Sequence, residues 1–113
     1  MMNMDTKTKK KLEASGWRVG DAKDFLGLSD DEAGFIELKL ALAQDLRTRR
    51  LARGLNQTQV AVLIGSSQSR VAKMEAAEAI VSVDLLIRSL LKLGAARKDV
   101  ARVVSRGPTA AAT

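Results

Sequence analysis

The sequence has no cysteine, no histidine and no tyrosine. Without cysteine it forms neither disulfides nor thiolate metal sites, which is typical of proteins from a reducing compartment. Without histidine it lacks the commonest general base and the commonest metal ligand. Carboxylates, lysine, arginine, serine and threonine remain, so we expect neither an enzyme nor a bound cofactor or metal.

Aromatic residues, proline and long apolar runs are also scarce. Trp17, Phe25 and Phe35 all lie in the first third of the 113 residues, so most of the core must be aliphatic. One proline and few β-branched runs favour an all-α fold over a β-rich one. The apolar run at 60–64 is too short to span a membrane. No apolar stretch follows the lysines at 9–11, so we expect no signal peptide and a cytoplasmic protein.

Positive charge is present and unevenly distributed. The formal net charge of +6 divides into −1 for residues 1–36, +4 for 37–76 and +3 for 77–113. A face that binds phosphates needs such a concentration of lysine and arginine. A solvated basic surface has the same composition, so charge alone does not decide between the two.

Capping signals predict a series of helices in a single domain. Ser29 with Glu32 and Asn56 with Gln59 match the capping box, and glycines follow the expected helix ends. Three acidic residues at 30–32 fit this cap better than a cation site. The expected helices cover residues 30–53, 57–64, 68–76, 83–93 and 96–104, within a domain at 30–105. Before it we expect a disordered basic arm at 1–15 and an N-terminal extension at 16–29, and after it a disordered tail at 106–113.

The second and third expected helices have the spacing of a helix-turn-helix. A tight crossing of two short helices needs a small residue in the first, glycine at the turn and apolar residues that anchor the second. Ala61, Gly65, Val71 and Met74 meet these needs, and Val60 and Ile64 face the core. The same spacing occurs in some plain helical hairpins. The neighbouring caps and the basic charge favour DNA binding over that alternative.

The outward residues of the third helix are candidate DNA contacts. In a helix-turn-helix this second element lies in the major groove with its N-terminal residues first. The sequence therefore predicts base contacts from Gln68, Ser69 and Lys73. Predicted phosphate contacts come from the helix starts and the basic flanks: Gln57, Thr58, Ser67, Arg70 and Arg53. Arg49 and Arg50 lie beside Arg53, and solvation of these arginines is as plausible as phosphate binding. Ser66 has no assigned role.

Residues 51–94 resemble the Xre, or phage-repressor-like, helix-turn-helix family. The resemblance rests on RGLNQ at 53–57, Ala61, Gly65, Ser67, Val71, the Met74-Glu75 pair and a leucine-rich fourth helix. It implies a five-helix lambda-repressor-like domain whose homodimer reads a palindromic operator. Residues 16–42 are similar to the lead-in of HigA-like antitoxins. That similarity implies a transcriptional repressor, the antitoxin of a type II toxin–antitoxin pair, which neutralises a RelE-like mRNA-cleaving toxin.

Residues 76–86 and the N-terminal extension are the two regions whose packing the family pattern does not predict. Alanines at 76–77 replace the usual glycine, so residues 76–79 are candidates for extending the recognition helix. Apolar residues that follow have no evident intrachain position, and we expect a dimer interface from Ile80, Val81, Val83 and Leu86. In the extension, Trp17, Val19, Phe25 and Leu28 either contact the toxin or dock on the chain's own core.

Three other functions remain as alternatives. A stand-alone Xre-type regulator would have no toxin partner, and an interaction adaptor would have kept the fold and lost DNA binding. The basic segment at 37–76 argues against the adaptor. An enzyme would have to use Ser69 and Lys73, one helical turn apart, as a Ser–Lys pair. The missing histidine, cysteine and phosphate-binding glycine loop argue against it.

Overall fold

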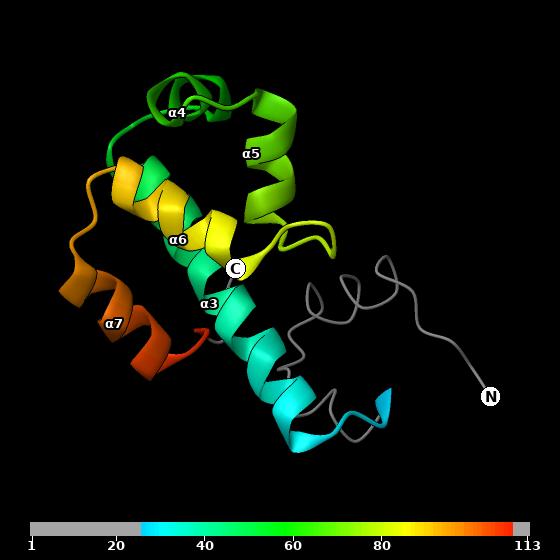
Figure 1. The fold of residues 1–113 in the computed structure, drawn as a ribbon. Helices are drawn as coiled ribbons and strands as arrows, with labels where there is room; N and C mark the ends of the chain where they lie inside the picture. Colours follow the sequence, from blue (N-terminus) through cyan, green and yellow to red (C-terminus); the bar gives the residue numbers. More distant parts are fainter. Residues whose placement is uncertain (1–25, 110–113) are drawn as a thin grey trace.

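The computed structural model describes residues 26–109, and this part is all α-helical, as predicted (Figure 1). The helices begin and end within two residues of the expected positions, and no strand is present among these residues. They are α3 (Asp30–Ala52), α4 (Gln57–Ile64), α5 (Gln68–Glu75), α6 (Val83–Lys92) and α7 (Arg97–Arg106).

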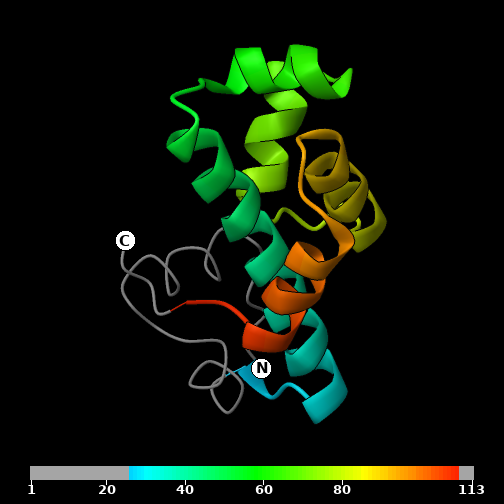
Figure 2. The ribbon, with the colours of Figure 1, turned by 90° about the vertical axis from the view of Figure 1, so that its left-hand side faces the viewer.

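The long helix α3 is the element on which the others assemble. α6 and α7 pack along it, and α4 and α5 lie together toward its C-terminal end (Figures 1 and 2). Leu42 and Leu46 on its apolar stripe are fully buried, whereas Phe35, at the start of the same stripe, is 55% exposed. The first turns of α3 extend past the other described helices, which explains this exposure (Figure 1).

The core is aliphatic, as the scarcity of aromatics predicted. Its largest fully buried side chains come from four helices: Leu42, Leu46, Val60, Val71, Met74, Leu86 and Leu90. The hydroxyl of Ser89 is also buried and lies 3.3 Å from the sulfur of Met74, which gives this polar group a partner. Val71 and Met74 therefore anchor α5 in the core, and the opposite face of α5 is exposed to solvent.

The two predicted capping boxes are confirmed. Ser29–Glu32 and Asn56–Gln59 form complete capping boxes at the starts of α3 and α4. Ser67 Oγ accepts a hydrogen bond from the Arg70 amide (3.2 Å), and Ser82 caps α6 in the same way. Satisfying these amides stops each new helix from fraying at its first turn. Local sequence thus determines where each of these helices starts.

The loop after α5 does not extend the recognition helix, and that expectation was wrong. α5 ends at Glu75, and Ala77 has a left-handed φ of 52°. The amides of Ala77 and Glu78 bond to the carbonyls of Met74 and Lys73, both at 3.1 Å. This is the Schellman arrangement, which ends a helix and normally has glycine at the left-handed position. The Lys39 ammonium on α3 donates to the carbonyl of Glu78 (2.7 Å), so the loop is fixed against α3.

None of the helices in the described part is both long and apolar enough to span a membrane.

Candidate nucleic-acid interface

The geometry of α4, the turn and α5 matches the predicted helix-turn-helix. Gly65 has φ +70°, and the amide of Ser66 bonds to the carbonyl of Ala61 at 2.8 Å, which closes α4 and turns the chain. Ala61 is 3% exposed, and α4 and α5 pack against each other. A φ of this sign suits glycine, which has no Cβ to clash with the backbone. Gly65 therefore sets the angle at which α5 leaves the turn.

The outward face of α5 is polar and accessible. Gln68, Ser69, Arg70 and Lys73 are exposed, while Val71 on the same helix is fully buried. Thr58, in the first turn of α4, is exposed as well. A hollow of about 280 Å³ lies beside this face, between α5, the 76–82 loop and α6. Its lining combines hydroxyls and two cations with an apolar floor: Ser67, Ser69, Arg70, Lys73, Ile80, Val81 and Leu85.

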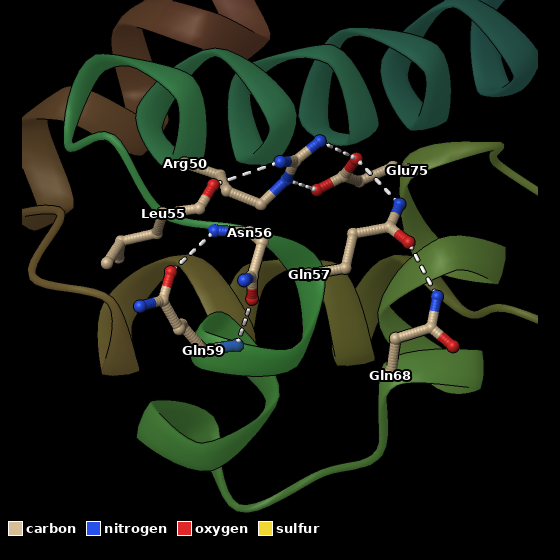
Figure 3. A network of polar contacts seen from close by, with 7 residues as sticks. All are labelled: Arg50, Leu55, Asn56, Gln57, Gln59, Gln68 and Glu75. Carbon is tan, nitrogen blue, oxygen red and sulfur yellow. Dashed lines mark hydrogen bonds and ion pairs between the residues drawn. The ribbon is translucent and has the colours of Figure 1, made fainter.

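A chain of hydrogen bonds leads from α3 to the first residue of α5 (Figure 3). Arg50 forms two hydrogen bonds to the carboxylate of Glu75, at 2.6 and 3.0 Å. Gln57 Nε2 donates to Glu75 Oε1 at 3.2 Å. Gln68 Nε2 then donates to Gln57 Oε1 at 2.7 Å. The chain links the core of the domain to the side chain that the sequence predicts as a base contact.

The ion pair in this chain is nearly inaccessible to water. The side chains of Arg50 and Glu75 are 11% and 5% exposed. The hydrogen bonds to Glu75 raise the pKa of Arg50 above its ordinary value, although burial alone would lower it. Arg50 therefore stays charged and holds the carboxylate of Glu75 in place. Glu75 has no role among the residues predicted from sequence, although its place in the Met74-Glu75 pair was a usable signal.

The sequence model of one protein family, described as a helix-turn-helix domain, matches residues 41–108. The match covers more than half of the chain, from within α3 to just beyond α7. The chain belongs to this helix-turn-helix domain family. The assignment is consistent with the resemblance to Xre proteins. No curated protein and no solved structure matched the chain.

The three arginines at the end of α3 all have partners within the helix-turn-helix domain. Arg50 binds Glu75, as described above, so neither of its two expected roles, phosphate binding or solvation, applies. Arg49 pairs with Asp45 one turn earlier, at 2.6 Å. Arg53 donates to the carbonyl of Leu93 at the end of α6, at 2.9 Å. Arg53 therefore ties α3 to α6, a structural contact that the sequence did not predict.

The expected dimer residues are divided by the helix-turn-helix fold. Val81 is 3% exposed and Leu86 is fully buried, so both belong to the domain's own core. The inference that Val81 lacks an intrachain place was wrong, because the loop folds back and inserts Val81 beside α5 and α6. Val83 is half-buried. Ile80 is 80% exposed, so of the four expected dimer residues it is the one whose side chain is accessible to a partner.

The expected toxin contacts lie mostly outside the described residues. Trp17, Val19 and Phe25 lie outside residues 26–109, whereas Leu28 is half-buried just before α3.

Within residues 26–109, no three acidic side chains come together as a metal site would require, including those at 30–32. The acidic residues there serve the cap: bonds to Ser29 lower the pKa of Asp31 and of Glu32.

Proposed function

We propose that this chain is a sequence-specific transcriptional repressor that binds a palindromic operator as a homodimer. The observation that carries the proposal is the hydrogen bond between Gln68 and Gln57, which links the outward face of α5 to the start of α4. In a helix-turn-helix these are the two elements that meet DNA. Membership of the helix-turn-helix domain family supports the same conclusion.

In the proposed complex, α5 enters the major groove with its N-terminus first. Gln68 and Ser69 lie in its first turn and Lys73 one turn further along, all on the exposed side. An amide forms paired hydrogen bonds with adenine, a hydroxyl bonds several base edges, and lysine bonds guanine or a nearby phosphate. These three side chains are the proposed base contacts.

Phosphates would be bound at the flanks of the same face. Thr58 lies in the first turn of α4, whose first amides have no partner within the helix and attract anions. Gln57 retains one N–H beyond the bond that it gives to Glu75. Ser67 and Arg70 extend the contact along α5. We leave Arg53 out, because its guanidinium is directed to the end of α6.

Two variants of α5 test the assignment of roles. The operator is first selected from random duplex DNA with the full-length chain, and affinities are then measured by fluorescence anisotropy. Gln68→Ala should weaken binding to the operator and reduce its preference over altered sequences. Arg70→Ala should weaken binding to all sequences alike and reduce the salt dependence. Wild-type affinity in both variants, or no selected sequence at all, would contradict the proposal.

Ile80 is the residue on which a test of the homodimer depends. A second copy would cover its exposed side chain and bring two recognition helices about one turn of DNA apart. Ile80→Asp should shift the chain toward monomer in sedimentation and reduce operator affinity, with little change in thermal stability because the side chain is exposed. A monomeric wild-type chain, on and off DNA, would contradict the homodimer.

We further propose that this repressor is the antitoxin of a type II pair and neutralises a RelE-like toxin. The similarity of residues 16–42 to HigA-like antitoxins supports this, with Trp17, Val19, Phe25 and Leu28 as the expected toxin contacts. Co-expression with the product of the neighbouring gene tests it. We expect co-purification and rescue of growth, both lost in Trp17→Ala. Operator binding without such a partner would instead favour a stand-alone regulator.

A further inference from the structure

We infer that Glu75, which is buried and bonded to none of the predicted base contacts, determines which bases Gln68 prefers. It acts by fixing the orientation of two glutamine amides in series. Glu75 is thus a positioning residue for recognition, not a DNA contact. The inference rests on the proposed function, because it requires Gln68 to read a base.

The orientation starts at the ion pair. A carboxylate accepts hydrogen bonds and donates none, and a guanidinium only donates. Both oxygens of Glu75 are bonded to Arg50, and Glu75 Oε1 accepts a further bond from Gln57. Gln57 must therefore turn its NH₂ group toward Glu75. The reverse orientation would place the carbonyl oxygen of Gln57 against a buried carboxylate, which is strongly unfavourable.

The constraint then passes to α5. With its NH₂ group toward Glu75, Gln57 presents its carbonyl oxygen to Gln68. Only the NH₂ group of Gln68 can bond to that oxygen, and it does so at 2.7 Å. The carbonyl oxygen of Gln68 points away from the chain of hydrogen bonds (Figure 3). The outer end of this side chain is therefore an acceptor, and one N–H beside it stays free.

An outward acceptor favours particular bases. In the major groove, adenine and cytosine present amino donors, whereas guanine and thymine present carbonyl acceptors. The carbonyl oxygen of Gln68 suits the amino group of adenine or cytosine. The remaining N–H of Gln68 suits N7 of adenine. We therefore expect adenine at this position, and we expect guanine and thymine to be disfavoured because two acceptors would face each other.

Glu75→Gln should release this constraint. Arg50 donates to both carboxylate oxygens, so a glutamine at this position can turn either its carbonyl oxygen or its NH₂ group toward Gln57. Gln57 can then turn either group toward Gln68. Gln68 in turn can present either its carbonyl oxygen or an NH₂ group outward. The preference for adenine over guanine should therefore be reduced.

The experiment uses the full-length chain and its selected operator. The base pair read by Gln68 is the one whose preference is lost in Gln68→Ala. Anisotropy then gives the affinity for all four bases at that pair. Wild type should prefer adenine roughly tenfold over guanine. Glu75→Gln should reduce this preference, and Gln57→Ala, which breaks the chain but keeps the ion pair, should reduce it to nearly equal affinities.

Thr58→Ala is the matched control, because Thr58 neighbours Gln57 on α4 but is not in the chain. It should weaken all four sequences alike and leave their order unchanged. A merely structural role of Glu75 would give the same uniform loss. Circular dichroism shows whether Glu75→Gln is folded at the assay temperature, and if it is not, Gln57→Ala decides.

The inference is overturned if the folded variants keep the full wild-type preference for adenine. It is also overturned if Gln68→Ala leaves every base preference intact. A wild-type chain that selects no DNA sequence would instead overturn the proposed function, and the two failures are therefore distinguishable.

Discussion

Arg50 on α3 and Glu75 at the end of α5 form a two-pronged ion pair across 25 residues of sequence. The remaining Nη1 of Arg50 donates to the carbonyl of Leu55, at 3.0 Å, before α4 begins. One guanidinium thus joins α3, the α3–α4 turn and α5. Both charged side chains are almost fully buried and have lost most of their contact with water. The opposite charge of the partner compensates each of them for this lost hydration.

Removing one member of this pair should be costly. Arg50→Met leaves the carboxylate of Glu75 buried without its counter-charge, and we expect a loss of about 3–5 kcal/mol in the free energy of unfolding. Urea denaturation measures it. The control is Arg88→Met, whose ion pair with Asp84 is more than 70% exposed on both sides and should contribute less than about 1 kcal/mol. Similar small losses in both variants would contradict this account.

The adjacent serines of the turn should respond to alanine with opposite signs. Among the described residues, Ser66 Oγ is the buried side-chain polar atom that lacks a hydrogen-bond partner. Ser66→Ala removes that unsatisfied group and should stabilise the domain by about 1 kcal/mol. Ser67→Ala removes the cap of α5 and should destabilise it by about 1 kcal/mol. Thermal or urea unfolding of the two variants tests this, and equal losses would refute the explanation for Ser66.

The helices and the turn were predictable because their signals are local. A capping box needs two residues three apart, such as Asn56 and Gln59, and both of its bonds are present. The turn needs glycine at one position, and Gly65 has the expected φ. The buried positions of α5, Val71 and Met74, follow from helical spacing alone.

The contacts that were missed join residues far apart in sequence. Nothing near Arg50 indicates that its partner is Glu75, so a solvated or phosphate-binding arginine was an equally good interpretation. Arg53 meets the carbonyl of Leu93, 40 residues later. Burial of Val81 depends on how the loop turns back, which follows from the left-handed Ala77 and from the Lys39 bond to Glu78. Such contacts emerge only from the packed fold.

The first cap of α3 should make stability depend on pH. Hydrogen bonds to Ser29 hold the pKa of Glu32 below its ordinary value of 4.5. The ionised carboxylate therefore adds stability that is present above pH 4.5 and is lost as the pH falls through the lowered pKa. Glu32→Gln keeps a capping side chain but cannot ionise. The free energy of unfolding of this variant, measured with urea, should fall below that of the wild type by the largest amount near pH 6. The difference should vanish on acidification, and a difference that is constant with pH would argue against this explanation.

The left-handed alanine after α5 gives a prediction with an internal control. Ala77 has φ 52° in a Schellman turn, whereas α4 ends with a glycine at the corresponding position. An L-residue there carries a steric cost of about 1–2 kcal/mol, which glycine avoids at a smaller entropic cost. Ala77→Gly should therefore stabilise the domain by about 0.5–1 kcal/mol. Ala76 has an ordinary right-handed conformation, so Ala76→Gly should destabilise by about 0.5–1 kcal/mol. Urea unfolding of both variants measures the difference, and a loss in both would show that Ala77 is not strained.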